Sequence, residues 1–140
     1  MNTFKNLDYS ELLDNNTSDY NGPHQELITN SRHIFDLMVK VLDDPDLPNA
    51  YRSKLLSVIG YFILPKDLYP EEEFGAIGYV DDLMAAIFVL KQIEQSNLTT
   101  KLNIYWSGVI NLEELLNVHF DNLRIDYMEL FNELIEYLDI

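Results

Sequence analysis

The chain contains no cysteine, so its fold depends on no disulfide, and it offers neither a thiolate metal ligand nor a thiol nucleophile. Basic side chains are also scarce: nine lysines and arginines stand against 24 acidic residues, which gives a formal charge of −15. Because binding to a phosphate backbone needs clustered basic side chains, this composition argues against direct nucleic-acid binding. A basic protein partner is the kind of molecule that such a charge attracts.

Long apolar runs are absent as well. Residues 55–64 form a run of only ten residues, and the run over residues 77–90 is interrupted by Asp81 and Asp82. The first residues do not show the basic stretch followed by an apolar run that is typical of a secretory signal. We therefore expect a cytoplasmic protein with no membrane span.

What the chain does have is enough apolar residues for one compact domain. Of its 140 residues 47% are apolar, and a chain of this length buries roughly two thirds of its unfolded surface. The acidity is concentrated in the flanks, because residues 1–50 carry a net charge of −6, residues 51–110 only −2, and residues 111–140 −7. The sequence predicts a single domain, residues 1–140, with a nearly balanced centre.

Apolar residues recur every three or four positions over residues 25–42, 48–63 and 80–93, which predicts three helices. The third stretch is apolar almost all round, so we expect it to be the most buried element. The Asn- and Asp-rich residues 1–23 predict a loosely ordered lead with at most one helical turn, at residues 9–13.

The last third of the chain is less clearly patterned. Residues 97–100 predict a turn, and residues 102–110 suit a short extended piece and a helix start equally well. The acidic segment over residues 111–140 regains the helical period and predicts one long helix, or two helices broken near Asn122. The predicted fold class is all-α, a compact bundle of four or five helices around an apolar helical hairpin.

The loop between the second and third predicted helices carries a distinctive pattern. It reads Pro-x-Asp-Leu-x-Pro, then a glycine, then Asp-Asp-Leu at the start of the next apolar helix; the motif residues are Pro65, Asp67, Leu68, Pro70, Gly78, Asp81 and Asp82. Residues 42–93 in this way resemble the YkvA-like family, domain of unknown function 1232. The acidic run at residues 71–73 departs from the family pattern. The resemblance implies a helical hairpin as the core and no established activity.

The three aspartates of this motif have two competing interpretations. A loop carboxylate beside two carboxylates at a helix start can bind a hard cation such as Mg²⁺, with Asp67 and Asp82 as candidate ligands. However, adjacent helical residues point about 100° apart, so Asp81 and Asp82 do not both face one ion without distortion. The alternative is structural: acids in a first helical turn accept hydrogen bonds from free backbone N–H groups, and Asp67 closes a turn.

No complete catalytic set is visible elsewhere, so the protein is not predicted to be an enzyme, and neither a catalytic residue nor a cofactor is assigned. A diphosphate-binding Asp-Asp-x-x-Asp pattern fails because position 85 is Ala85. His24, His33 and His119 do not form a metal face, and Ser57 and Ser107 have no base nearby in sequence.

Acidic residues of the C-terminal segment provide the candidate interaction surface, represented by Glu129, Glu133 and Glu136. The leading hypothesis is a non-enzymatic protein–protein interaction or regulatory module that binds a basic partner. One alternative is an acidic inhibitor, immunity protein or nucleic-acid mimic that acts on a toxin or nuclease. The other is a metal-dependent enzyme that uses Asp67, Asp81 and Asp82. Homo-oligomerisation is compatible with each.

Overall fold

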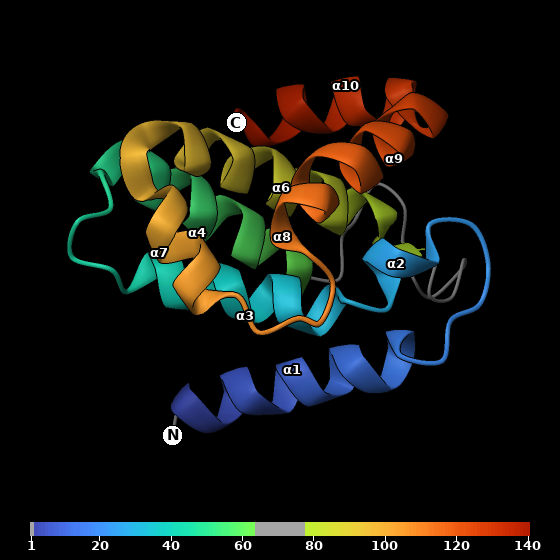
Figure 1. The fold of residues 1–140 in the computed structure, drawn as a ribbon, viewed down its shortest axis with the longest axis horizontal. Helices are drawn as coiled ribbons and strands as arrows, with labels where there is room; N and C mark the ends of the chain where they lie inside the picture. The colour runs from blue at the N-terminus through green and yellow to red at the C-terminus, as the bar shows by residue number, and fades with distance from the viewer. Residues whose placement is uncertain (1, 64–77) are drawn as a thin grey trace.

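The computed structural model describes residues 2–63 and 78–140, with side chains from Tyr9 onward except that of Asn97. All regular secondary structure in this part of the chain is helical, which confirms the all-α class (Figure 1). The α-helices and the two π-helical turns, η2 and η3, are α1 (Asn2–Thr17), α2 (Gln25–Ile28), α3 (Ser31–Leu42), α4 (Asn49–Ile63), α6 (Val80–Ile93), η2 (Glu94–Leu98), α7 (Thr99–Tyr105), α8 (Leu112–Glu114), η3 (Leu115–His119), α9 (Phe120–Asp126) and α10 (Met128–Leu138).

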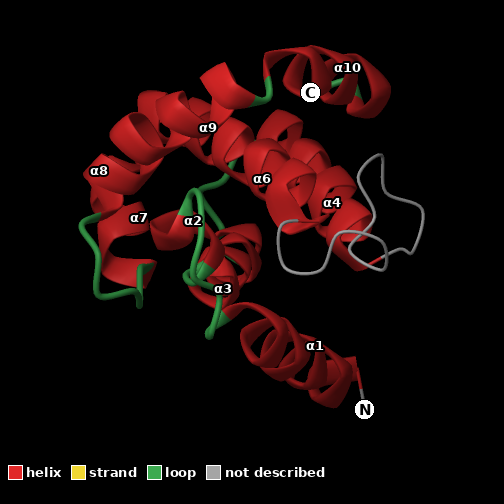
Figure 2. Cartoon of the chain, turned by 90° about the vertical axis from the view of Figure 1, so that its right-hand side faces the viewer, coloured by secondary structure: helices red, strands yellow, loops and turns green. Residues whose placement is uncertain are grey.

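Helix α6 is the centre of the fold (Figure 2). It contacts α3 and α4 on one side and α9 and α10 on another, and its residues from Val80 to Leu90 are all buried except the half-buried Phe88. This confirms the prediction that the third apolar stretch is the most buried. The physical reason is that a helix without a polar face gains free energy only when neighbours remove all of its sides from water.

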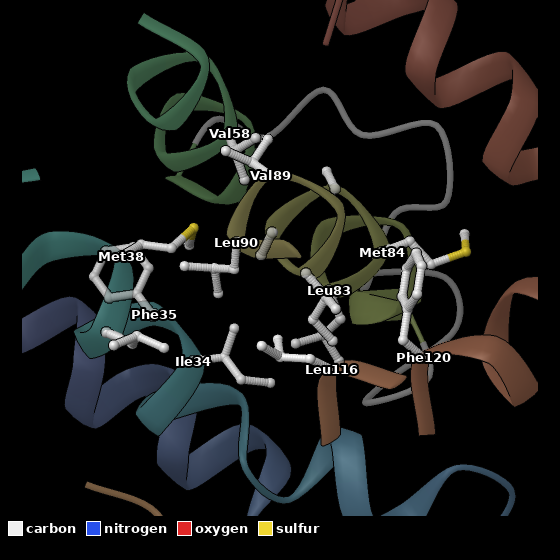
Figure 3. Packing of buried hydrophobic residues seen from close by; sticks show 14 of the residues in the cluster. Ile34, Phe35, Met38, Val58, Leu83, Met84, Val89, Leu90, Leu116 and Phe120 are labelled. Atoms are coloured by element: carbon white, nitrogen blue, oxygen red, sulfur yellow. The ribbon is translucent and has the colours of Figure 1, made fainter. Parts of the chain in front are cut away.

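The core forms where helices distant in sequence meet α6. Figure 3 shows Ile34 of α3 and Leu116 of η3 directed toward Leu83 of α6, and all three side chains are fully buried. Full burial of each such side chain contributes roughly 1.5–3 kcal/mol relative to its exposure. These contacts join the predicted hairpin to both flanks of the chain.

Helix α1 is much longer than the single turn predicted at residues 9–13. It runs from Asn2 to Thr17 and packs along α3 at one edge of the molecule (Figure 1). Leu13 is fully buried in the common core, and the Tyr9 ring lies 4.9 Å from the Phe35 ring between their centroids. Tertiary packing of a few apolar residues therefore stabilises a helix whose Asn-rich sequence has little intrinsic preference for one.

The chain also divides some of the predicted helices. The first stretch breaks at residues 29–30 into α2 and α3, and the C-terminal stretch breaks at Tyr127 rather than Asn122, because Tyr127 has a φ of −125°. The turn predicted at residues 97–100 is wrong, since η2 continues directly into α7. Leu98 and Leu102 are both buried, and this packing keeps the segment helical. Residues 102–105 belong to α7, and residues 106–111 form an irregular loop with a bend at residues 109–110, so the extended piece considered for residues 102–110 is not formed.

Candidate functional site

The motif of the predicted hairpin falls partly within the described residues. Gly78, Asp81 and Asp82 are described and buried, at the entry to α6. The remaining motif residues lie outside the described residues; they are Pro65, Asp67, Leu68 and Pro70. The predicted metal pair of Asp67 and Asp82 therefore stays a prediction. Among the residues that are described, no group of three or more histidine, aspartate or glutamate side chains is arranged to hold a metal ion.

Asp81 and Asp82 form the first turn of α6, and both side chains are fully buried. The Tyr61 hydroxyl of α4 donates a hydrogen bond to Asp81 Oδ2 at 2.6 Å, and the Asp82 backbone N–H donates to Asp81 Oδ1 at 3.0 Å. An acidic group in this position also interacts favourably with the positive end of the helix dipole. These contacts give Asp81 a role in joining the two helices of the hairpin.

Helix α1 meets the same end of the hairpin. The Tyr9 hydroxyl donates to the backbone carbonyl of Phe62 at 2.6 Å, and Asn16 Nδ2 donates to the Tyr79 hydroxyl oxygen at 3.1 Å. Because Phe62 lies at the end of α4 and Tyr79 precedes α6, polar contacts from α1 reach both helices of the hairpin.

A second polar cluster lies where α3 ends, centred on the buried carboxylate of Asp44. It accepts hydrogen bonds from the Tyr105 hydroxyl at 2.6 Å, from Lys101 Nζ at 2.9 Å and from the Asp46 backbone N–H at 2.8 Å. These contacts lower the pKa of Asp44 to about 2, and the hydrogen bond from Tyr105 has the largest effect. The same hydrogen bond raises the pKa of Tyr105 above its usual value. Lys101 also binds Asp46 Oδ2 at 2.6 Å.

Arg52 holds the other side of this loop. Its guanidinium donates to the backbone carbonyls of Leu42, Asp44 and Leu47, with distances of 3.1 Å to Asp44 and 3.2 Å to Leu47. The Leu42 carbonyl lies at the end of α3, where carbonyls have no partner within the helix, and the same arginine of α4 also binds two carbonyls of the following loop. The cluster thus fixes α3, α4 and α7 relative to one another, which is a structural function.

The structure also pairs a histidine with a serine that sequence spacing did not connect. His33 Nδ1 lies 2.9 Å from Ser107 Oγ, and the His33 ring packs edge-on against Trp106 at 6.1 Å between centroids. A nucleophilic serine needs a base that is itself oriented by a third group. The nearest candidate in sequence, Asp36, instead accepts a hydrogen bond from Ser10 Oγ and lies 3.7 Å from the Arg32 guanidinium. The pair tethers the residue 106–111 segment to α3.

The predicted interaction residues share one face of α10. Glu129, Glu133 and Glu136 are exposed and are spaced four and three residues apart, so their side chains follow one line along the helix. The opposite face buries Phe131 and Leu134. Among the described residues, no ion pair involves these three glutamates, whereas Asp126 pairs with His24 and Asp121 pairs with Arg124.

The central segment of the chain matches a known family model. Residues 52–88 match the family described as "Protein of unknown function (DUF1232)", and they include most of α4 and the greater part of α6. Over 106 residues the chain is 28% identical to the "Uncharacterized protein ORF9" of Methanothermobacter thermautotrophicus, an alignment that covers 75% of this chain and 72% of that protein. No solved structure matches the chain significantly.

The family match supports the resemblance of the hairpin. The alignment with the uncharacterized relative spans 106 residues, so it also includes residues outside 52–88. No helix in the described part of the chain has the length and apolar character needed to cross a bilayer.

Proposed function

We propose that this protein is a non-enzymatic interaction module that binds a basic protein through the outer face of α10. The observation that carries the proposal is the row of exposed carboxylates at Glu129, Glu133 and Glu136, which take part in no ion pair among the described residues. Isolated like charges on one helix face repel one another. A basic partner removes that repulsion, and the resulting complementarity accelerates association.

The burial pattern also supports a surface role for these residues. Helix α10 packs on the core through Phe131 and Leu134, so the three carboxylates do not contribute to core packing. Charge reversal should therefore change binding without changing the fold. This separation makes the proposal testable with variants that remain folded.

The test begins with the purified protein as bait in a lysate of its source, washed at rising salt. The retained partner is then purified, and its dissociation constant is measured for the wild type and for the triple variant Glu129→Lys, Glu133→Lys and Glu136→Lys. We expect the triple variant to weaken binding about tenfold or more, with the unfolding midpoint nearly unchanged. Because exposed charges are screened, the wild-type affinity should also fall as salt rises.

A matched control reverses three exposed acids on the opposite flank of the chain: Glu11→Lys, Asp19→Lys and Glu26→Lys. It changes the net charge by the same amount, so it separates the α10 face from overall charge. Equal loss of affinity in both triple variants, or none in the α10 variant, would reject the proposal. Competition with DNA or RNA for the same partner tests the nucleic-acid mimic, which requires mutual exclusion.

A further inference from the structure

Helices α9 and α10 lie against α6 (Figures 1 and 2). Residues of these three helices line a pocket of about 230 Å³. Its lining residues come from all three helices and the adjoining η2 turn: Phe88, Lys91, Gln92, Gln95, Phe120, Asp121, Arg124 and Phe131. The spacing of the first four residues places them on one face of the central helix and its continuation. No sequence motif predicts this pocket.

The floor of the pocket is aromatic. The Phe131 ring packs edge-on against Phe88 at 5.4 Å and against Phe120 at 5.8 Å between centroids. Phe120 and Phe131 are buried, and Phe88 is half-buried. Three rings in edge-to-face contact form a rigid apolar surface that favours a further ring packed against it.

Two cations line the same pocket. Lys91 Nζ lies 5.1 Å from the centroid of the Phe120 ring, and the Arg124 guanidinium lies 3.6 Å from Asp121 Oδ1. That separation exceeds hydrogen-bonding distance, so the Arg124 N–H groups are not hydrogen-bonded to Asp121. Asp121 is the one carboxylate in the lining, so the pocket carries an excess of positive charge within a protein of net charge −15.

One of the two glutamines in the lining, Gln92, is held in place by two hydrogen bonds. Its Oε1 accepts from Lys54 Nζ at 2.7 Å, and its Nε2 donates to the Ile140 carbonyl at 3.3 Å. These two hydrogen bonds hold the Gln92 side chain in one position at the edge of the pocket. Lys91 and Arg124 are the two cationic groups of the lining that can turn toward a bound anion.

From this arrangement we propose that the pocket binds a small aromatic carboxylate, with its ring on the Phe88, Phe120 and Phe131 floor and its carboxylate between Lys91 and Arg124. A dry cavity of about 150 Å³ accepts benzene, so a pocket of about 230 Å³ has room for one ring with a short carboxylate arm. A guanidinium binds a carboxylate through paired N–H groups, and an ammonium adds a point charge. This site is independent of the acidic face of α10.

The test titrates phenylacetate, the probe, into the full chain at physiological salt. Binding is measured from the NMR chemical shifts of the backbone amides. A ligand this small is expected to bind with a dissociation constant near about 1 mM. Shifts should concentrate on the pocket helices α6, α9 and α10. Phenylacetamide, which keeps the ring but lacks the charge, and acetate, which keeps the charge but lacks the ring, should each bind about tenfold more weakly.

Two variants test whether Lys91 and Arg124 bind the carboxylate of the probe. Lys91→Gln and Arg124→Gln should each weaken phenylacetate binding about tenfold and leave phenylacetamide unaffected. Lys40→Gln makes the same charge change at an exposed lysine of α3 outside the pocket, and it should leave binding unchanged. Equal affinity for phenylacetate and phenylacetamide, or equal effects of Lys40→Gln and the two pocket variants, would overturn the assignment.

Discussion

The Tyr61 hydroxyl donates a 2.6 Å hydrogen bond to Asp81 Oδ2, and both residues are buried within residues 52–88, the segment that matches the family model. This contact joins the two helices of the hairpin at a point where a carboxylate would otherwise be costly to bury. Tyr61→Phe keeps the ring and removes only the donor. We expect it to lower the free energy of unfolding by about 1–3 kcal/mol in urea titrations.

The control is Tyr51→Phe, which makes the same change on the same helix at a half-buried tyrosine with no hydrogen bond from its hydroxyl in the described structure. It should change the free energy of unfolding by less than about 0.5 kcal/mol. Equal effects of the two variants would contradict a structural role for the bond between Tyr61 and Asp81.

Stability should depend on pH through Asp44. Because its folded pKa of about 2 lies below the ordinary value of 3.8, its contribution is complete above about pH 4 and is lost as pH falls toward 2. Asp44→Asn should therefore lower the melting temperature at pH 7, and its difference from the wild type should shrink between pH 4 and pH 2. Asp43→Asn removes the same charge at an exposed neighbour and should show no such convergence. A difference that stays constant down to pH 2 would show that the Asp44 contacts do not depend on its charge.

The attachment of α1 can be tested with two adjacent leucines. Leu13 is 0% exposed and Leu12 is 52% exposed, so the same truncation samples the buried and the open face of one helix. Leu13→Ala should cost about 2–5 kcal/mol of unfolding free energy, and Leu12→Ala less than about 1 kcal/mol. Limited proteolysis should in addition cut residues 2–17 faster in the Leu13 variant. Similar costs for both variants would show that α1 does not pack as described.

Two glycines should respond in opposite directions to alanine. A Cβ at Gly108 would lie 2.3 Å from Cζ2 of Trp106, whereas a Cβ at helical Gly60 would meet nothing within 4 Å. Gly108→Ala should destabilise by about 1–3 kcal/mol and shift the emission of Trp106, the single tryptophan of the chain. Gly60→Ala should stabilise by about 0.5–1 kcal/mol. Unchanged tryptophan emission in Gly108→Ala would indicate that the loop relaxes without moving the indole.

Local pattern predicted the elements whose burial repeats along the chain. The apolar residues of α4 and α6 recur at helical spacing, so their extents were predictable to within about one residue, and so was the central position of α6. The helix over residues 2–17 was missed, because its stabilising contacts come from Phe35 and Phe62, which are distant in sequence. The C-terminal break was predicted near Asn122 and lies at Tyr127, five residues later, because local propensity defines helix boundaries only weakly.

The candidate sites divide in the same way. The exposed row of Glu129, Glu133 and Glu136 follows from helical spacing alone, and so does its opposition to the buried Phe131. The bond between Tyr61 and Asp81, the cluster at Asp44 and the pocket under Lys91 and Arg124 each join segments far apart in the chain.

The sequence by itself determined the all-α class, the charge of the flanks and the identity of the buried central helix, because composition and periodicity are properties of neighbouring residues. Only the tertiary structure decided which polar groups meet and where two cations share an aromatic floor. Those contacts depend on how the helices pack, and packing is settled by the shapes of side chains from several helices at once.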